Sequence, residues 1–289
     1  MKKAKGYTIM LTSARKSVFL YGTVDTFSMT EGGPRLALDV CESIGACLTA
    51  TFYNLENNVP PPKWGRDSAE LEAFSDRREA ANLANVETLR SEALRRSIGF
   101  SAVTNIVHSH GVVASLADRA RLYDLIVTGV DRHGMLSDRS IAEHLLFATG
   151  RPVLVTPTHF SATFSCRRMV AAWDNSRSAA RALNDALLLF PDVEEIVLLV
   201  IGGEKAIDSS LDDAEVLGAL QMRNVQATIE RRAFGGRSIG SAIQESAIDL
   251  SADLLIMGGY GHSRLREFLL GGATASVLDQ PMLPVLLSH

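Results

Sequence analysis

Residues 253–274 read DLLIMGGYGHSRLREFLLGGAT, and this stretch decides the fold expected of the chain. Its apolar run at 254–257 is too short for a buried helix and ends in two glycines. The run therefore predicts a strand that is covered on both faces and leads into a loop. Glycines flank an amphipathic segment at 265–270, at Gly258, Gly261, Gly271 and Gly272. Because glycine lets a ligand approach main-chain N–H groups, this spacing predicts two turns around one small space.

The pattern Gly258-x-x-Gly261, nine residues, then Gly271 resembles the nucleotide loop of the universal stress protein family. At the next position the family has Ser or Thr, whereas this chain has Gly272, and its nearest hydroxyl belongs to Thr274. The resemblance implies that ATP or another adenine nucleotide binds here, with or without Mg²⁺. Backbone amides then replace the family's hydroxyl as the main phosphate contacts.

A second segment, AAWDNSRSAARAL at 171–183, resembles the family's first strand and the turn into its first helix. The resemblance implies that Asp174 contacts the base or ribose and that backbone near Val200 contacts adenine. The residues alone equally describe a helix-capping turn at Asp174 and Ser176. Arg264 is a phosphate candidate by its chemistry, with simple surface exposure as the alternative. The expected nucleotide-binding residues are Ala172, Trp173, Asp174, Val200, Met257, Gly258, Gly261, Arg264, Gly271, Gly272, Ala273 and Thr274.

An internal repeat predicts two domains. DLIVTG at 124–129 matches DLLIMG at 253–258, and RPVLV at 151–155 resembles LPVLL at 283–287 in the same order. Two copies of one domain, at 1–157 and 166–289, explain both matches, although buried strands also resemble one another by chance. Strands and helices alternate in each copy, with a proline-rich loop expected at 57–65 and Ser238 as the expected N-cap of a helix in the second copy. The expected fold is α/β, with two tandem open parallel five-stranded sheets and helices on both faces, as in Rossmann-like universal stress proteins.

The first copy lacks the glycine loop. Gly129 is present, but Arg132 stands where the second copy has Gly261. We expect side chains to fill this space, so that the first copy binds no nucleotide. It could instead serve as a packing partner, with the two terminal strands meeting as they do in dimers of the family that the sequence resembles, which gives an internal domain–domain pseudo-dimer. A homodimer of two chains is a further option that the sequence leaves open.

Charge and cysteine usage exclude several classes of function. Lys and Arg total 29 against 33 Asp and Glu, for a formal charge of −4, so we expect neither nucleic acid nor membrane as a partner. The three cysteines form no C-x-x-C pair, and no secretory leader or membrane-spanning run is recognisable, which indicates the cytoplasm.

No pattern resembles a nucleophile with its base, so we expect binding and not catalysis. The sequence thus indicates a stress protein that binds an adenine nucleotide in the second copy and acts through partner contacts. One alternative is a nucleotide-free scaffold of the same family that works by protein interaction only. A slow ATPase is a weaker alternative.

Overall fold

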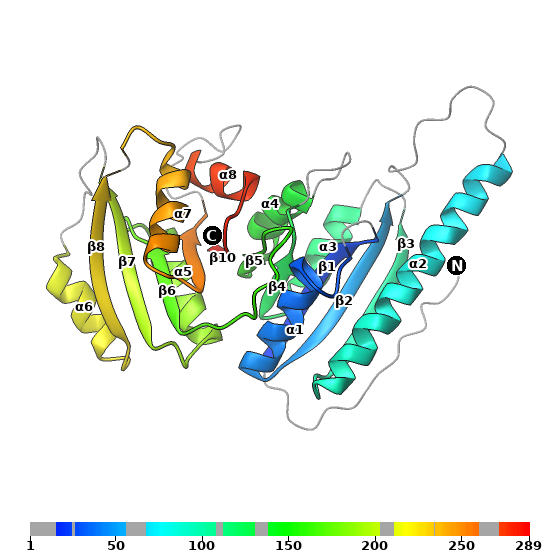
Figure 1. Ribbon diagram of the computed structural model, residues 1–289, viewed down its shortest axis with the longest axis horizontal. Helices are drawn as coiled ribbons and strands as arrows, with labels where there is room; N and C mark the ends of the chain where they lie inside the picture. The colour runs from blue at the N-terminus through cyan, green and yellow to red at the C-terminus, as the bar shows by residue number, and fades with distance from the viewer. Residues whose placement is uncertain are drawn as a thin grey trace. The chain divides into compact units, whose positions relative to one another are not determined.

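The structure is a computed structural model, and it divides into two compact units. Unit 1 comprises Met1–Arg151 with Thr158–Thr163, and unit 2 comprises Pro152–Pro157 with Phe164–His289. Both are built from parallel strands alternating with helices, which confirms the predicted α/β class (Figure 1). The residues that the structure describes are 16–24, 27–55, 68–107, 112–130, 138–202, 211–233, 235–259 and 272–289.

The described residues of unit 1 contain four parallel strands in the order β3-β2-β1-β4. The strands are β1 (Lys16–Thr23), β2 (Ala46–Leu55), β3 (Phe100–Val107) and β4 (Leu125–Thr128). The helices are α1 (Gly32–Ile44), α2 (Ser68–Arg95), α3 (Val112–Ala120) and α4 (Asp138–Thr149). The α2 helix is the longest element of this unit and runs beside β2 and β3 (Figure 1).

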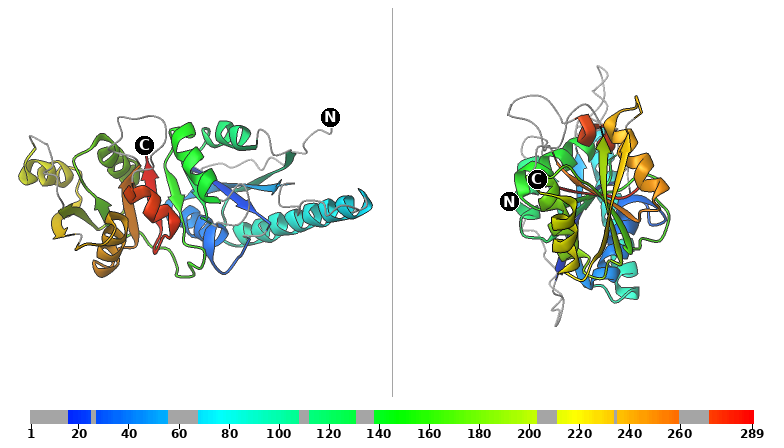
Figure 2. Two further views of the ribbon diagram at one scale, coloured as in Figure 1. Left: turned by 90° about the horizontal axis from the view of Figure 1, so that it is seen from above. Right: turned by 90° about the vertical axis from the view of Figure 1, so that its left-hand side faces the viewer.

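In unit 2, the described part of the chain forms five parallel strands in the order β10-β9-β6-β7-β8. The strands are β6 (Arg168–Ala172), β7 (Glu195–Gly202), β8 (Gln226–Ala233), β9 (Leu254–Gly258) and β10 (Val285–Ser288). The helices are α5 (Arg177–Leu189), α6 (Asp213–Gln221), α7 (Ile239–Asp249) and α8 (Gly272–Asp279). Helices α5 and α6 lie on one face of this sheet and α7 lies on the other (Figure 2).

Strand β5 (Val153–Val155) belongs to unit 2, whereas the sequence placed these residues at the end of the first domain. It pairs antiparallel with β10, with Leu154 opposite Leu286. This pairing satisfies backbone groups of β10 that would otherwise form an open edge. The boundary at residue 157 therefore does not coincide with the boundary between the compact units.

Most other element predictions agree with the structure. Ser238 caps α7 as expected, because its hydroxyl accepts the N–H of Ser241 at 3.1 Å. The predicted amphipathic segment at 265–270 and the proline-rich loop at 57–65 lie outside the described residues. In the ranges given above, no helix combines the length and the apolar character needed to cross a membrane.

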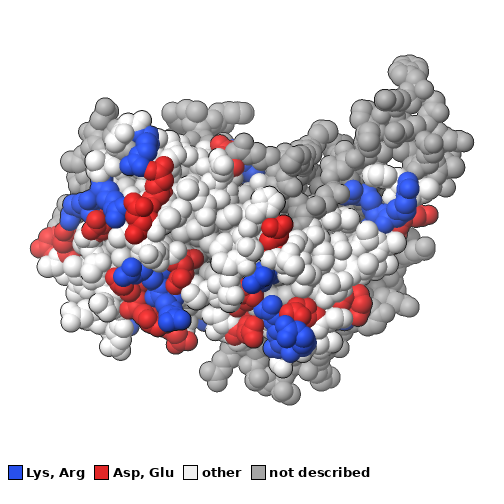
Figure 3. Space-filling view, in the orientation of Figure 1, with Lys and Arg blue, Asp and Glu red and all other residues white. Residues whose placement is uncertain are grey.

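Charged residues of both signs lie next to each other on the face shown in Figure 3. In unit 2, for example, Arg231 pairs with Asp213 at 2.7 Å and Arg232 pairs with Asp249 at 3.0 Å. Paired charges of opposite sign largely cancel each other's field at a distance. This arrangement agrees with the nearly balanced charge of the sequence.

Candidate functional site

The carboxyl ends of β6, β9 and β10 meet at one edge of unit 2. The register pairs Ala171 with Ile256, so Trp173 lies level with Gly258, and Gly258 itself pairs with Ser288. Residues level with one another on neighbouring parallel strands share a face of the sheet. We call the row Trp173, Gly258 and Ser288 the carboxyl edge of unit 2. Ligands of open α/β sheets bind outside such strand ends.

Gly258 is in contact with the first turn of α5. A Cβ added at Gly258 would lie 2.4 Å from the carbonyl carbon of Ser178 and 2.5 Å from the backbone nitrogen of Ala179. Its φ does not lie in the left-handed region. Unusual backbone angles are therefore not the reason for this glycine. Glycine is needed because two backbones approach each other so closely.

The turn between β6 and α5 is a helix-capping turn. The Asp174 carboxylate accepts the N–H of Ser176 at 2.9 Å, and the Ser176 hydroxyl accepts the N–H of Ala179 at 3.1 Å. Asn175 has a φ of 56°, in the left-handed region that Asn adopts more readily than most residues. The capping interpretation of Asp174 and Ser176 is thus correct, and it positions α5 over Gly258. It leaves the predicted base or ribose contact of Asp174 untested.

Three buried polar atoms at this edge have no hydrogen-bond partner among the described residues: Trp173 Nε1, Asn175 Oδ1 and Ser288 Oγ. Ser288 as a whole is only 1% exposed. Leaving a buried polar group without a partner costs about 1–3 kcal/mol. Their grouping around one edge indicates a place where a polar ligand would complete the hydrogen bonding. No sequence pattern singled out Asn175 or Ser288, because only the tertiary arrangement buries them here.

Hydrogen bonds hold Gly259, the residue that directly follows β9, in place. The N–H of Gly259 donates to the Ser288 carbonyl at 2.7 Å, and His289 Nδ1 donates to the Gly259 carbonyl at 3.0 Å. Both backbone groups of Gly259 are therefore satisfied. Three predicted site residues, Gly261, Arg264 and Gly271, lie outside the described residues.

Helix α8 begins at Gly272, the position where the sequence departs from the family pattern. Gly272 is exposed, and an added Cβ would meet no atom of the described residues within 4 Å. Packing therefore does not require glycine at this position. Ala273 and Thr274 follow in the first turn, and Thr274 is buried.

The glycine that does pack tightly against α8 is Gly240 of α7. A Cβ added there would lie 2.6 Å from the Ser276 side chain and 2.8 Å from the Ala273 carbonyl oxygen. This role could not be predicted, because Gly240 lies inside an ordinary helical pattern.

The structure brings the remaining predicted residues together on three adjacent strands. Ala172 of β6 pairs with Leu199 of β7, which places Trp173 level with Val200. Met257 immediately precedes Gly258 on β9 and is buried. The sheet therefore lines up the predicted residues of β6, β7 and β9 in one place.

Unit 1 differs at the corresponding positions. The sheet registers make Gly22 the counterpart of Trp173 and Phe52 the counterpart of Val200. A Cβ added at Gly22 would lie 2.9 Å from the Phe52 ring, and the Phe27 ring meets the Phe52 ring edge-on at 5.5 Å. In unit 2 the larger residue of the pair is Trp173, directly after β6, whereas in unit 1 it is Phe52 on β2. The rings of Phe52 and Phe27 therefore lie at this level of the sheet in unit 1.

Two of the described thiols are unreactive, and the described residues contain no group of metal ligands. Burial raises the pKa of the Cys41 and Cys166 thiols, so both stay protonated at neutral pH. In the same ranges, no three His, Cys, Asp or Glu side chains are grouped to hold a metal ion.

The chain is similar to known proteins in sequence and in fold. Residues 166–289 match the Universal stress protein family. Universal stress protein Slr1230 of Synechocystis sp. is 27% identical over 148 residues, which cover 50% of this chain and 49% of that relative, so the match spans about half of its length. A solved universal stress protein from Archaeoglobus fulgidus is 16% identical with a TM-score of 0.63, over 95% of this chain and 96% of that one. At this identity the structural likeness shows the fold.

Proposed function

Because residues 166–289 match the Universal stress protein family, we propose that unit 2 binds an adenine nucleotide at its carboxyl edge. ATP is the first candidate. The protein then acts in the stress response through contacts with partners and not by turnover. Trp173, Gly258 and Ser288 mark the edge, and the glycine loop that begins at Gly258 supplies the phosphate contacts.

The observation that carries this proposal is the group of unpartnered polar atoms of Trp173, Asn175 and Ser288. They comprise one N–H donor, one carbonyl acceptor and one hydroxyl, and all are uncharged. Such groups complement the base and the ribose of a nucleotide. A nucleoside presents ring-nitrogen acceptors, hydroxyls and an amino group within a small volume.

The phosphates require a different kind of contact. Main-chain N–H groups in glycine-rich turns and at helix N-termini bind phosphate. Gly258 opens such a loop in the sequence, and α8 begins at Gly272 where that loop ends. Mg²⁺ would enter with the phosphates, since it is held by few carboxylates and by phosphate oxygens. The three free cysteines support a reducing cytoplasm as the location.

One observation favours the second candidate, a nucleotide-free scaffold. Gly272 replaces the family's hydroxyl residue although the structure leaves room for a side chain there. The loss of that hydroxyl lowers the affinity for triphosphate. In this reading the protein works through its surface alone.

Nucleotide release tests the two candidates. Purified protein is denatured and the supernatant is examined for adenine nucleotides by mass spectrometry, before and after incubation with ATP. The variant Gly261→Arg copies the Arg132 of the first domain and should abolish binding. Gly218→Arg, at an α6 position with nothing within 4 Å of an added Cβ, is the matched control and should keep it. Absence of nucleotide in all three proteins, even with added ATP, supports the scaffold.

A further inference from the structure

We propose that Trp173 is the residue that recognises the base. Its indole Nε1–H donates a hydrogen bond to a ring nitrogen of the bound adenine, and the indole forms one wall of the base site. This inference rests on the proposed function of unit 2. It goes beyond that function because it assigns a donor and a direction of hydrogen bonding to one side chain.

The first reason is the unsatisfied donor. Trp173 Nε1 is buried and has no acceptor in the part of the chain that the structure describes. An indole N–H can only donate, so its partner must be an acceptor. Buried tryptophans usually place this N–H against a partner. A bound ligand with an exposed lone pair supplies what the protein lacks here.

The second reason is the position of Trp173. Its backbone N–H donates to the Leu199 carbonyl at 2.8 Å, which continues the pairing of β6 with β7 beyond Ala172. The residue is therefore held by the sheet and not by a free loop. Val200 lies level with it on β7, and Gly258 lies level with it on β9. The indole is therefore attached at the end of the strand that lies between the two strands carrying Val200 and Gly258.

The third reason is the contrast with unit 1. There Gly22 occupies the position of Trp173, and the bulky side chain at this level is Phe52 on the neighbouring strand. Phenylalanine carries no donor. Both units place an aromatic ring at this level, but only the ring of unit 2 can donate a hydrogen bond. The exchange therefore adds a recognition group to the unit whose sequence has the glycine loop.

The ligand chemistry follows from the donor. Adenine has unprotonated ring nitrogens at N1, N3 and N7, and each accepts one hydrogen bond. Replacement of one of them by C–H gives the 1-deaza, 3-deaza and 7-deaza analogues of ATP. The analogue that lacks the acceptor of Trp173 cannot make the hydrogen bond, whereas the other two can.

The test combines one variant with the three analogues. Trp173→Phe keeps an aromatic ring and removes the N–H. Calorimetric titration with ATP should show affinity about five- to tenfold weaker than that of wild type, the value of one hydrogen bond. Wild type should bind one of the three analogues about five- to tenfold more weakly than it binds ATP. For Trp173→Phe, that same analogue should bind as well as ATP does.

A fluorescence measurement keeps the proposal testable if Trp173→Phe folds poorly. The chain has two tryptophans, Trp64 and Trp173, so Trp64→Phe leaves Trp173 as the single emitter. Its emission should change on addition of ATP, with a midpoint that matches calorimetry. Equal ATP affinity of wild type and folded Trp173→Phe would overturn the assignment while leaving the proposed function intact. Failure of wild type to bind ATP and all adenine analogues would instead overturn the proposed function itself.

Discussion

Gly258 and Ser178 approach so closely that no side chain fits between them, because a Cβ on Gly258 would lie 2.4 Å from the Ser178 carbonyl carbon. The end of β9 and the first turn of α5 are thereby fixed against each other. The same contact fixes the start of the glycine loop. The stability of unit 2 and the geometry of its carboxyl edge therefore depend on one residue.

Gly258→Ala should destabilise the protein by about 1–3 kcal/mol, because the added methyl group meets backbone atoms that cannot rotate away. Urea unfolding monitored by circular dichroism measures this loss. Gly272→Ala is the matched control, since a Cβ at Gly272 meets none of the described residues within 4 Å. Its effect should stay within about 0.5 kcal/mol. Equal stability of the two variants would contradict the packing role of Gly258.

Gly272→Ser should raise the affinity for ATP. The substitution restores the hydroxyl found in the family pattern, and the site has room for it. A new hydrogen bond to a charged phosphate oxygen is worth about 1.5–3 kcal/mol, or roughly ten- to hundredfold in affinity. Titration calorimetry with ATP and with adenosine checks this. The gain should be absent for adenosine, which has no phosphate, and a gain of the same size for adenosine would disprove the assignment.

The protein should bind one nucleotide per chain. In unit 1 the Phe52 ring lies over Gly22 and is supported by Phe27, at the level where unit 2 has Val200 and Trp173. Native mass spectrometry with saturating ATP measures the number of nucleotides bound. A second nucleotide that persists in Gly261→Arg would show that unit 1 binds as well.

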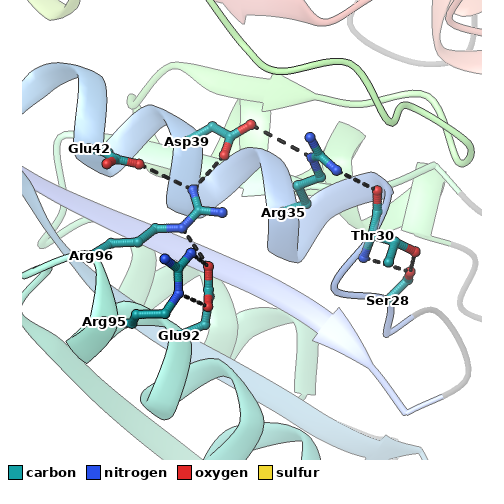
Figure 4. Close-up of polar contacts among 8 residues, drawn as sticks. All are labelled: Ser28, Thr30, Arg35, Asp39, Glu42, Glu92, Arg95 and Arg96. Carbon is teal, nitrogen blue, oxygen red and sulfur yellow. Dashed lines mark hydrogen bonds and ion pairs between the residues drawn. The ribbon is translucent and has the colours of Figure 1, made fainter.

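A buried ion pair connects α1 to the residue after α2 in unit 1. Arg96 donates to Asp39 at 2.6 Å, and the Asp39 side chain is 6% exposed (Figure 4). Asp39→Asn should cost about 1–3 kcal/mol, because it removes a charge that the buried end of Arg96 needs. Asp118→Asn, which removes an exposed pair with Arg121, is the control and should change stability by less than about 1 kcal/mol. Thermal unfolding compares the two.

The same network makes stability depend on pH. Hydrogen bonds from Arg95, which has the larger effect, and from Arg96 lower the pKa of Glu92 from 4.5 to about 2 (Figure 4). A lowered carboxyl pKa stabilises the folded state above pH 4.5, and this contribution is lost as the pH falls toward 2. The free energies of unfolding of wild type and Glu92→Gln should therefore differ at pH 6 and become equal near pH 2. A difference that stays constant over this range would contradict the prediction.

Much of the fold could be predicted because buried strands are short apolar runs with glycine at their ends. Residues 254–257 and the capping Ser238 illustrate this, since each signal is local in sequence. The pairing of β5 with β10 was expected from the family resemblance alone, because an apolar run does not specify which strand it pairs with. The reason for Gly258 was missed, since a contact with Ser178 is visible only in three dimensions. For the same reason, no pattern marked Asn175 and Ser288 as residues of the site.

A crystal structure of the protein with a non-hydrolysable ATP analogue tests the central claim most directly. The account predicts electron density for one nucleotide in unit 2, with the base against Trp173 and Val200 and the phosphates at the loop that begins at Gly258. It predicts no such density beside Phe52 in unit 1. Saturated crystals with an empty edge at Trp173, Gly258 and Ser288, or with nucleotide bound elsewhere, would contradict it.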